Sequence, residues 1–195
     1  MHFAQSNDNI WGTGVNGKVD SEEHTFDDLN VYSVRGPLSK KFLTERGINC
    51  PPLYGDPALL FRRFFPEFYK NNIIRDVLVI SNYKEPTINN SSKYFKVISP
   101  LGDPFKIIHE ISTSKLVISS SLHAIILAEV YGRSAILLKT KKEHKFKYVD
   151  YLLGTGRDTY PPAKDIKDAL KAKPLPNVKF NSEAIIDSFP VHLYE

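Results

Sequence analysis

The chain has 195 residues and a mass of 22.2 kDa, which suits one hydrophobic core with appended segments. Apolar residues make up 42% and charged residues 25%, as in a folded globular protein rather than a disordered one. The formal net charge is +4. Residues 1–30 hold six acidic residues and one lysine, a net of −5, so the remaining residues carry +9. This basic excess suits an anionic small ligand, but it has no dense stripe of basic and aromatic residues and so predicts no nucleic-acid partner.

Cysteine and histidine usage narrows the chemistry further. The single cysteine, Cys50, excludes an internal disulfide framework and a cysteine-built zinc site. It also favours a reducing compartment, although a single cysteine is compatible with export as well. No apolar run approaches the 18 residues of a membrane-spanning helix. The spacing of histidines and acidic residues does not predict a metal site, and we expect neither a metal nor a cofactor.

Short apolar runs alternate with helical segments along the chain. We expect strands over residues 31–34, 76–81, 94–99, 115–119 and 134–138, and helices over residues 37–46, 104–112, 122–131, 146–153 and 165–172. This alternation predicts parallel strands joined by right-handed crossovers, hence an α/β fold with a Rossmann-like parallel sheet and flanking helices. We expect that sheet within residues 71–160. Residues 1–70 then form the remnant of a preceding domain with an interdomain segment, and residues 161–195 form a last helix and tail.

Residues 119–123 are the clearest candidate for a ligand site. A buried strand ends in Ser119, Ser120 and Ser121 and runs through Leu122 into a helix that carries His123 in its first turn. The unpaired N–H groups and the dipole of a helix N-terminus attract anions. A histidine beside a bound anion is suited to acid or base catalysis near neutral pH. The alternative interpretation is an ordinary helix cap with a surface histidine.

Three other segments carry weaker signals. Arg35 lies between a predicted strand and the start of a predicted helix. A guanidinium in this place can bind a carboxylate or phosphate with two hydrogen bonds. The alternative interpretation is a surface arginine in a capping turn. The glycines of the segment Gly12-Thr13-Gly14 permit a close approach by a ligand or by another strand. The lysine-rich run that begins at Lys139 follows a strand and is either a phosphate or lipid-surface contact or a solvated face.

Together these segments resemble the polysaccharide pyruvyltransferase family. The matching pieces are Trp11-Gly12-Thr13-Gly14, Val34-Arg35-Gly36-Pro37-Leu38-Ser39, Gly55-Asp56-Pro57-Ala58 and Ser119-Ser120-Ser121-Leu122-His123-Ala124. Their order and spacing over residues 5–155 make the resemblance specific. It implies a fold like the C-terminal part of a two-domain GT-B glycosyltransferase. It also implies transfer of a pyruvate ketal from phosphoenolpyruvate to sugar hydroxyls in exopolysaccharide or capsule synthesis.

The resemblance also implies roles for individual residues. His123 is expected to move the protons, and Arg35 to clamp phosphoenolpyruvate. Substrate contacts are expected from residues 12–14 (Gly12, Thr13, Gly14), residues 119–122 (Ser119, Ser120, Ser121, Leu122) and Lys139. The acceptor is expected to be a saccharide, often lipid-linked in this family, which places the protein in the cytoplasm with the inner membrane face as an alternative location.

Two departures from the family pattern matter. Members usually have a full Rossmann-like region before the Trp11-Gly12 segment, so this sequence is expected to be a C-terminal portion. Some members carry an arginine where this chain has Ser121, and Arg133 and Lys139 are the candidates to replace it. Two other functions therefore stay open: a GT-B glycosyltransferase that uses a nucleotide sugar, and a non-catalytic fragment that only binds an anion.

Overall fold

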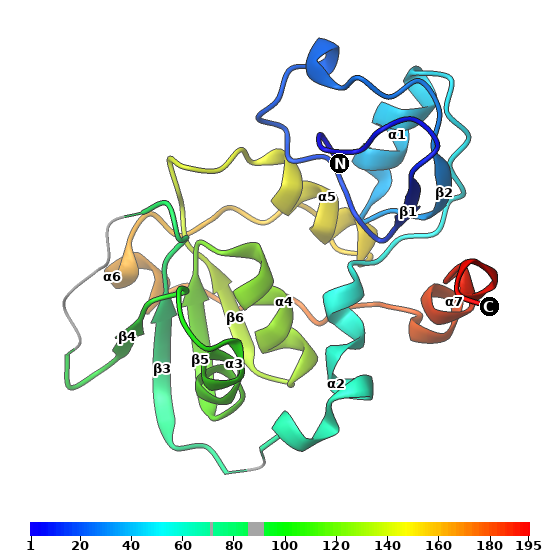
Figure 1. Ribbon diagram of the computed structural model, residues 1–195. Helices are drawn as coiled ribbons and strands as arrows, with labels where there is room; N and C mark the ends of the chain where they lie inside the picture. Colours follow the sequence, from blue (N-terminus) through cyan, green and yellow to red (C-terminus); the bar gives the residue numbers. More distant parts are fainter. Residues whose placement is uncertain (71, 86–91) are drawn as a thin grey trace. The chain divides into compact units, whose positions relative to one another are not determined.

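The computed structural model describes residues 1–70, 72–85 and 92–195 (Figure 1). The chain divides into two compact units that are not continuous in sequence. Unit 1 comprises Met1–Pro57, Glu143–Thr159 and Val178–Glu195, and unit 2 comprises Ala58–Lys142 and Tyr160–Asn177. The sequence suggested three consecutive segments instead, because residue patterns do not show where a chain returns to an earlier part of the fold.

Unit 2 is built on a parallel four-stranded sheet. Its strands are β3 (Arg75–Ile80), β4 (Lys96–Ile98), β5 (Ser114–Ser119) and β6 (Ser134–Leu137), in the order β4-β3-β5-β6. All three neighbouring pairs are parallel. This arrangement confirms the predicted α/β class with a parallel, helix-flanked sheet. Val77 and Val79 alternate with Leu78 and Ile80 along β3, so both faces of the strand are apolar, as a sheet covered on both sides requires.

Helices cover one face of this sheet. Helix α3 (Pro104–Ser112) joins β4 to β5, and α4 (Leu122–Val130) joins β5 to β6, and the two helices pack against each other and against β5. Asp103 caps α3 by accepting from the N–H of Phe105, and the chain leaves α4 through Gly132, whose φ of +70° suits the left-handed turn after a helix. The aromatic residues that precede β3 form the short helix α2 (Phe61–Phe64) between two 3₁₀ turns, Pro57–Leu60 and Pro66–Phe68.

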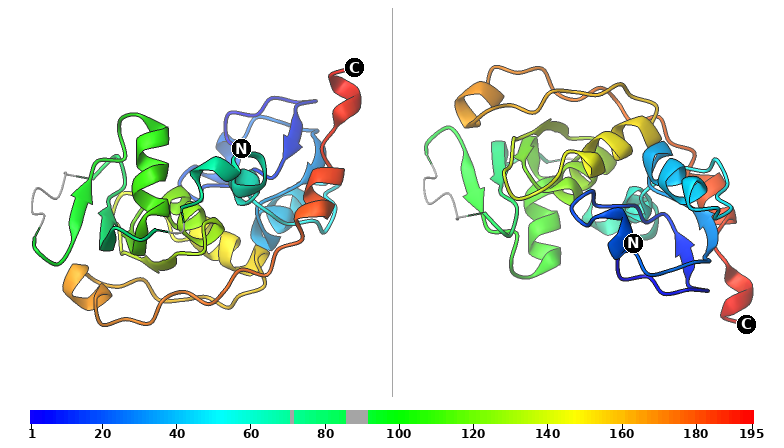
Figure 2. Two further views of the ribbon diagram at one scale, coloured as in Figure 1. Left: turned by 90° about the horizontal axis from the view of Figure 1, so that it is seen from below. Right: turned by 90° about the horizontal axis from the view of Figure 1, so that it is seen from above.

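A returning segment covers part of the opposite face of the sheet (Figure 2). Residues 160–177 run along β6, where the N–H of Ala163 donates to Leu137 O and the N–H of Lys139 donates to Ala163 O, each at 2.8 Å. Within this segment α6 (Ile166–Ala169) places Ala169 and Ile166 against Val79 and the neighbouring strands. The sequence predicted a helix over residues 165–172, and the structure forms only its first turn as an α-helix.

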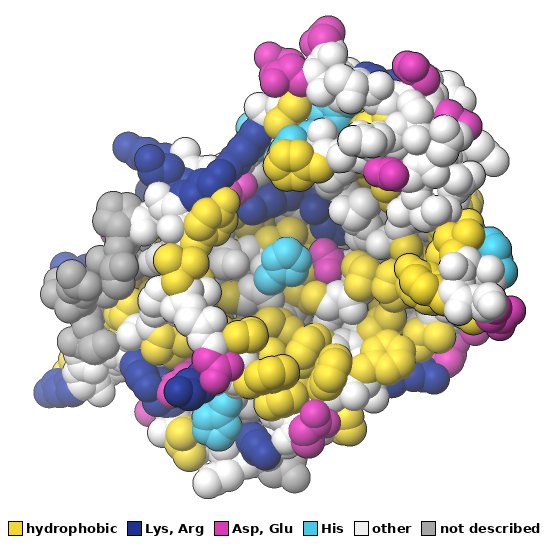
Figure 3. Space-filling view, in the orientation of Figure 1, with side chains coloured by type: hydrophobic (Ala, Val, Ile, Leu, Met, Phe, Trp, Pro, Cys, Tyr) yellow, Lys and Arg dark blue, Asp and Glu magenta, His cyan; other side chains and the backbone are white. Residues whose placement is uncertain are grey.

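Unit 1 has a smaller parallel sheet of two strands, β1 (Asn9–Trp11) and β2 (Asn30–Ser33). Its helices are α1 (Pro37–Glu45), α5 (Phe146–Gly154) and α7 (Ser182–Asp187), with 3₁₀ turns at Ser21–Glu23 and Val191–Leu193. The strand at residues 31–34 and the helices at 37–46 and 146–153 were predicted within a residue or two, whereas β1 and α7 were not predicted. Acidic side chains gather around the Ser21–Glu23 turn at the top of Figure 3, as the charge distribution of residues 1–30 indicates.

Candidate functional site

The carboxyl ends of β3 and β5 form the topological switch point of unit 2. These two strands are neighbours, but the chain leaves β3 towards β4 on one side and leaves β5 through α4 towards β6 on the other. In open parallel sheets the loops diverge at such a point and leave a crevice where ligands bind. Residues 81–85 follow β3, and residues 119–123 end β5 and begin α4, so the predicted serine and histidine segment lies at this switch point.

Two of the three serines link the diverging loops. Both Ser119 and Ser120 are fully buried. The hydroxyl of Ser119 donates to Ile80 O at 2.6 Å and accepts from the N–H of Ser121 at 2.9 Å. The hydroxyl of Ser120 accepts from the N–H of Asn82 at 2.8 Å and donates to the carboxylate of Glu85. These hydroxyl groups therefore fix the segment after β3 to the end of β5.

Glu85 is a residue at this switch point that the sequence analysis did not single out. Its Oε2 accepts from the N–H of Asn82 at 3.1 Å as well as from Ser120, and its own N–H donates to Asn82 O at 2.9 Å. The carboxylate thus closes a local turn after β3 and fixes that turn to the end of β5. No sequence pattern indicates this contact, because Glu85 and Ser120 are 35 residues apart.

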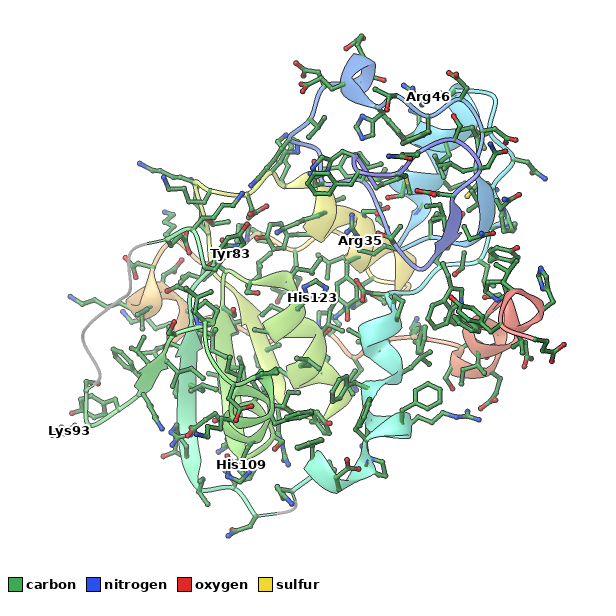
Figure 4. The ribbon with its side chains drawn as sticks, in the orientation of Figure 1. Arg35, Arg46, Tyr83, Lys93, His109 and His123 are labelled. Atoms are coloured by element: carbon green, nitrogen blue, oxygen red, sulfur yellow. The ribbon has the colours of Figure 1, made fainter. Side chains whose placement is uncertain are left out.

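The start of α4 presents the remaining predicted residues. Ser121 is the N-cap residue and makes no side-chain cap hydrogen bond. Leu122 is buried and anchors the first turn, whereas the side chain of His123 is exposed in that turn (Figure 4). Helix α4 has nine residues, so its dipole at this end is developed. An exposed imidazole beside the positive end of a helix is arranged to meet an anion and to exchange protons with it.

Arg133 and Lys139, the two candidates to replace the arginine that some family members carry at the position of Ser121, lie at different ends of the sheet. Arg133 follows α4 and precedes β6, so it lies at the opposite end of the helix from His123, and its guanidinium donates to Lys70 O. With a rise of about 1.5 Å per residue, the nine residues of α4 separate the two positions by more than 10 Å. The Arg133 alternative is therefore wrong. Lys139 follows β6 and lies at the carboxyl edge of the sheet, as an anion ligand at this edge requires.

The glycine-rich segment and Arg35 belong to unit 1. Arg35 is buried with 8% of its surface exposed, and its guanidinium donates to Val15 O and lies 3.2 Å from the carboxylate of Asp150. A Cβ atom at Gly14 would lie 2.7 Å from the Arg35 guanidinium and from the Ser39 hydroxyl, so a larger residue there would displace these side chains. The N–H of Arg35 also donates to Thr13 O at 3.1 Å. Residues 12–15 and Arg35 thus form one packed unit, and Arg35 is not the surface arginine of the alternative interpretation.

Asp150 occupies the anion-binding end of α1. Its Oδ1 accepts from the N–H groups of Leu38 and Ser39 at 2.9 and 3.0 Å, and its Oδ2 accepts from the Ser39 hydroxyl at 2.6 Å. The carboxylate is fully buried. A helix N-terminus beside an arginine is the arrangement from which an anion site was predicted here. The chain fills that site with its own carboxylate, supplied from α5.

The lysine-rich run that begins at Lys139 is divided between the two units. Lys139 belongs to unit 2, whereas Lys147 belongs to unit 1, where it pairs with Glu143 at 3.0 Å. Glu143 also pairs with Lys18 at 2.9 Å. Burial lowers the pKa of Lys147, although Glu143 opposes that shift. Only part of the run is therefore a solvated basic surface.

Residues 1–70, 72–85 and 92–195 form neither a metal-binding cluster nor a membrane-spanning helix. No group of three or more histidine, cysteine or acidic side chains there is placed to hold a metal ion. None of the helices formed by these residues is long and apolar enough to cross a membrane.

Comparison with known proteins decides the family. The family model for polysaccharide pyruvyl transferases matches residues 6–141, well over half of the chain. The chain belongs to the polysaccharide pyruvyl transferase family. The matched stretch contains every candidate residue named above from Gly12 to Lys139, whereas Asp150 lies beyond it. A search of curated proteins and a search of solved structures each gave no match.

Proposed function

We propose that this protein transfers the pyruvyl group of phosphoenolpyruvate to a pair of sugar hydroxyls as a cyclic ketal, in the synthesis of an exopolysaccharide or capsule. The observation that supports this most is the exposed His123 in the first turn of α4, at the switch point of a parallel sheet. Membership of the family supports pyruvyl transfer in general. Phosphoenolpyruvate carries a carboxylate and a phosphate, and a helix N-terminus suits both.

The proposed reaction assigns a proton to each step. The enol double bond takes a proton from His123 at C3, and a sugar hydroxyl adds to C2 and gives its proton to the imidazole. The C2–O bond to phosphate then breaks, and inorganic phosphate leaves with the bonding pair. The second hydroxyl adds to C2 and gives its proton to the departing phosphate, which leaves as hydrogen phosphate, and the ketal ring closes. One acid or base group that alternates between its two forms is sufficient for these transfers.

The remaining candidate residues receive different roles in this proposal. The N–H groups at the start of α4, with Ser121 and Lys139, bind the anionic groups of the substrate. Ser119 and Ser120 position the loops, because their hydroxyls are already hydrogen-bonded within the fold. The guanidinium of Arg35 already forms an ion pair with the carboxylate of Asp150. We therefore propose that Arg35 contributes by holding residues 12–15 in place rather than by clamping phosphoenolpyruvate.

Ligand-induced stabilisation tests the proposed donor. Saturation at 100 times Kd raises the free energy of unfolding by about 2.7 kcal/mol, which is readily seen in a melting curve followed by circular dichroism. Phosphoenolpyruvate is expected to stabilise the chain more than inorganic phosphate at equal concentration. Equal stabilisation by both would contradict the proposal, and stabilisation by a nucleotide sugar alone would favour the glycosyltransferase.

Variants of two histidines test the catalytic role. His123→Ala is expected to lower phosphate release from phosphoenolpyruvate, in the presence of a panel of simple glycosides, by about 10²-fold or more. His109→Ala is the matched control, because His109 is an exposed histidine at the far end of α3. Near-normal turnover by His123→Ala would overturn the assignment, as would an equal loss in both variants.

A further inference from the structure

A hollow lies on the face of the unit 2 sheet opposite α3 and α4. Its volume is about 720 Å³, which falls in the range of about 300–1,000 Å³ typical of pockets for small organic ligands. The apolar part of its wall consists of Phe95, Leu138, Ile166 and Leu170. Charged side chains and one serine complete the lining: Ser81, Glu85, Lys139, Lys164, Asp165 and Lys167.

The hollow is present because the returning segment, residues 160–177, forms only one short helix over this face of the sheet. Residues 160–177 follow the edge of β6 and continue into α6, a single helical turn of four residues. That turn packs over Val79, Ile118 and Ile136 in the middle of the sheet. Figure 2 shows α6 on this face, across the sheet from α3. The space between α6 and Phe95 is therefore left open down to an apolar floor.

The charged groups around the hollow are not equally available. The carboxylate of Glu85 is hydrogen-bonded to Ser120 and to the N–H of Asn82. The carboxylate of Asp165 is the N-cap of α6 and accepts from the N–H of Asp168 at 2.9 Å. By contrast, the ammonium groups of Lys139, Lys164 and Lys167 are exposed and have no hydrogen-bond or ion-pair partner among the described residues. The rim therefore offers three cations above apolar walls.

We propose that this hollow binds an organic diphosphate, with its apolar body against the walls and its phosphates on the three lysines. Three ammonium groups match the charge of a diphosphate, and ammonium groups bind phosphate as point charges without a fixed geometry. A small polar anion such as phosphoenolpyruvate has no apolar body to fill a space of about 720 Å³. Nucleoside diphosphates and prenyl diphosphates share the required chemistry. Residues 119–123 do not line this hollow, but Lys139, which the proposed function assigns to the anionic groups of the substrate, does. The test variants below therefore leave Lys139 unchanged.

Calorimetric titration of the full chain with three probes tests the proposal. The probes are uridine diphosphate, farnesyl diphosphate below its micellar concentration, and inorganic pyrophosphate. At least one organic diphosphate is expected to bind more tightly than pyrophosphate, because only the organic ligands bury apolar surface. Binding to uridine diphosphate alone identifies a nucleotide source, and binding to farnesyl diphosphate alone identifies a prenyl source.

Variants of the lining locate the binding. Lys164→Gln with Lys167→Gln is expected to weaken binding roughly fivefold to tenfold, since each exposed pair contributes up to about 1 kcal/mol. Leu170→Trp is expected to weaken binding by narrowing the hollow along its apolar wall, and Leu170 is 43% exposed, so the change leaves the core intact. Lys171→Gln with Lys173→Gln is the matched control, because both lysines are exposed in the same segment and do not line the hollow.

Three results would overturn the proposal. Pyrophosphate binding as tightly as both organic ligands would show that the apolar walls contribute nothing. Equal effects of the lining and control variants would place the binding elsewhere, and the absence of binding by every probe would remove the site. Melting curves of each variant confirm that it is folded. Stabilisation by phosphoenolpyruvate that persists in Leu170→Trp would leave the proposed transferase function standing even if this site fails.

Discussion

Asp150 offers the most direct test of how unit 1 is held together. Its buried carboxylate accepts hydrogen bonds from two N–H groups of α1 and from the Ser39 hydroxyl. It also lies 3.2 Å from the Arg35 guanidinium. Asp150→Ala leaves a buried arginine without its counter-ion and a helix N-terminus without its cap. Breaking a buried ion pair from one side costs about 3–5 kcal/mol. We therefore expect unit 1 to lose most of its stability in this variant.

The single tryptophan provides the assay. Trp11 belongs to unit 1, where its indole N–H lies 3.0 Å from Ile185 O and 3.1 Å from the Ser188 hydroxyl, so its fluorescence reports the unfolding of that unit. With a urea dependence of about 1–3 kcal/mol per molar, the expected loss lowers the midpoint by about 2 M. Far-UV circular dichroism follows the whole chain in the same titration.

A double-mutant cycle gives the refuting result. Arg35→Met alone leaves the carboxylate buried without its cation, whereas Arg35→Met with Asp150→Ala removes both charges. The double variant is expected to be less destabilised than the sum of the two single variants, by about 1–3 kcal/mol. Additive losses, or a loss below about 1 kcal/mol in Asp150→Ala, would refute the reasoning. Glu45→Ala is the control, because its partner Lys41 is solvent-exposed and the midpoint should not move.

Three further predictions concern single residues. Burial alone would raise the pKa of Glu110, but hydrogen bonds and charge from two basic neighbours hold it below its ordinary value. The stability from this group is therefore lost as pH falls below about 4.3, and Glu110→Gln should flatten that acid limb in melting curves. Burial raises the pKa of Cys50 to about 11, so iodoacetamide at pH 8 should label it slowly in the native chain and rapidly in urea. Gly36→Ala should destabilise unit 1 in the Trp11 assay more than Gly47→Ala does, because a Cβ at Gly36 would collide with the backbone oxygen of Asp150. At Gly47 nothing lies within 4 Å, and the cost is only that of its φ of +78°, about 1–2 kcal/mol.

The elements of unit 2 were predictable because local patterns agree with the fold. The apolar run of β3 has the length and composition of a strand buried on both faces, and Gly132 marks the end of α4. Strands and helices alternate along this part of the chain. Because short strand–helix–strand connections form right-handed crossovers between parallel strands, this alternation predicts the parallel sheet. The same reasoning placed His123 at a strand end, because ligands meet parallel sheets at their carboxyl edges.

Long-range side-chain contacts were not predictable in this way. Asp150 accepts a hydrogen bond from the hydroxyl of Ser39, which is 111 residues away in the sequence. Glu85 accepts one from Ser120, which is 35 residues away. No period or spacing in the sequence connects such positions. Strand β1 was missed because three residues are too few to show alternation, and α6 was predicted too long because residues 170–172 have a helical composition without a partner surface. Division into units failed for the same reason, since the returning segments are recognised only by what they pack against.

The two strand-to-helix turns of the family pattern have the same local architecture and different occupants. In unit 1 the turn after β2 leads into α1, and Asp150 fills its N-terminus with a buried carboxylate. In unit 2 the turn after β5 leads into α4, where Ser121 makes no side-chain cap hydrogen bond and His123 is exposed. An anion site filled by the chain's own carboxylate contributes to packing, and one left accessible attracts a ligand. On the proposed function, the family pattern therefore combines a structural half around Arg35 with a chemical half around His123. Substitutions in the first half should act through stability, whereas those in the second should act through turnover.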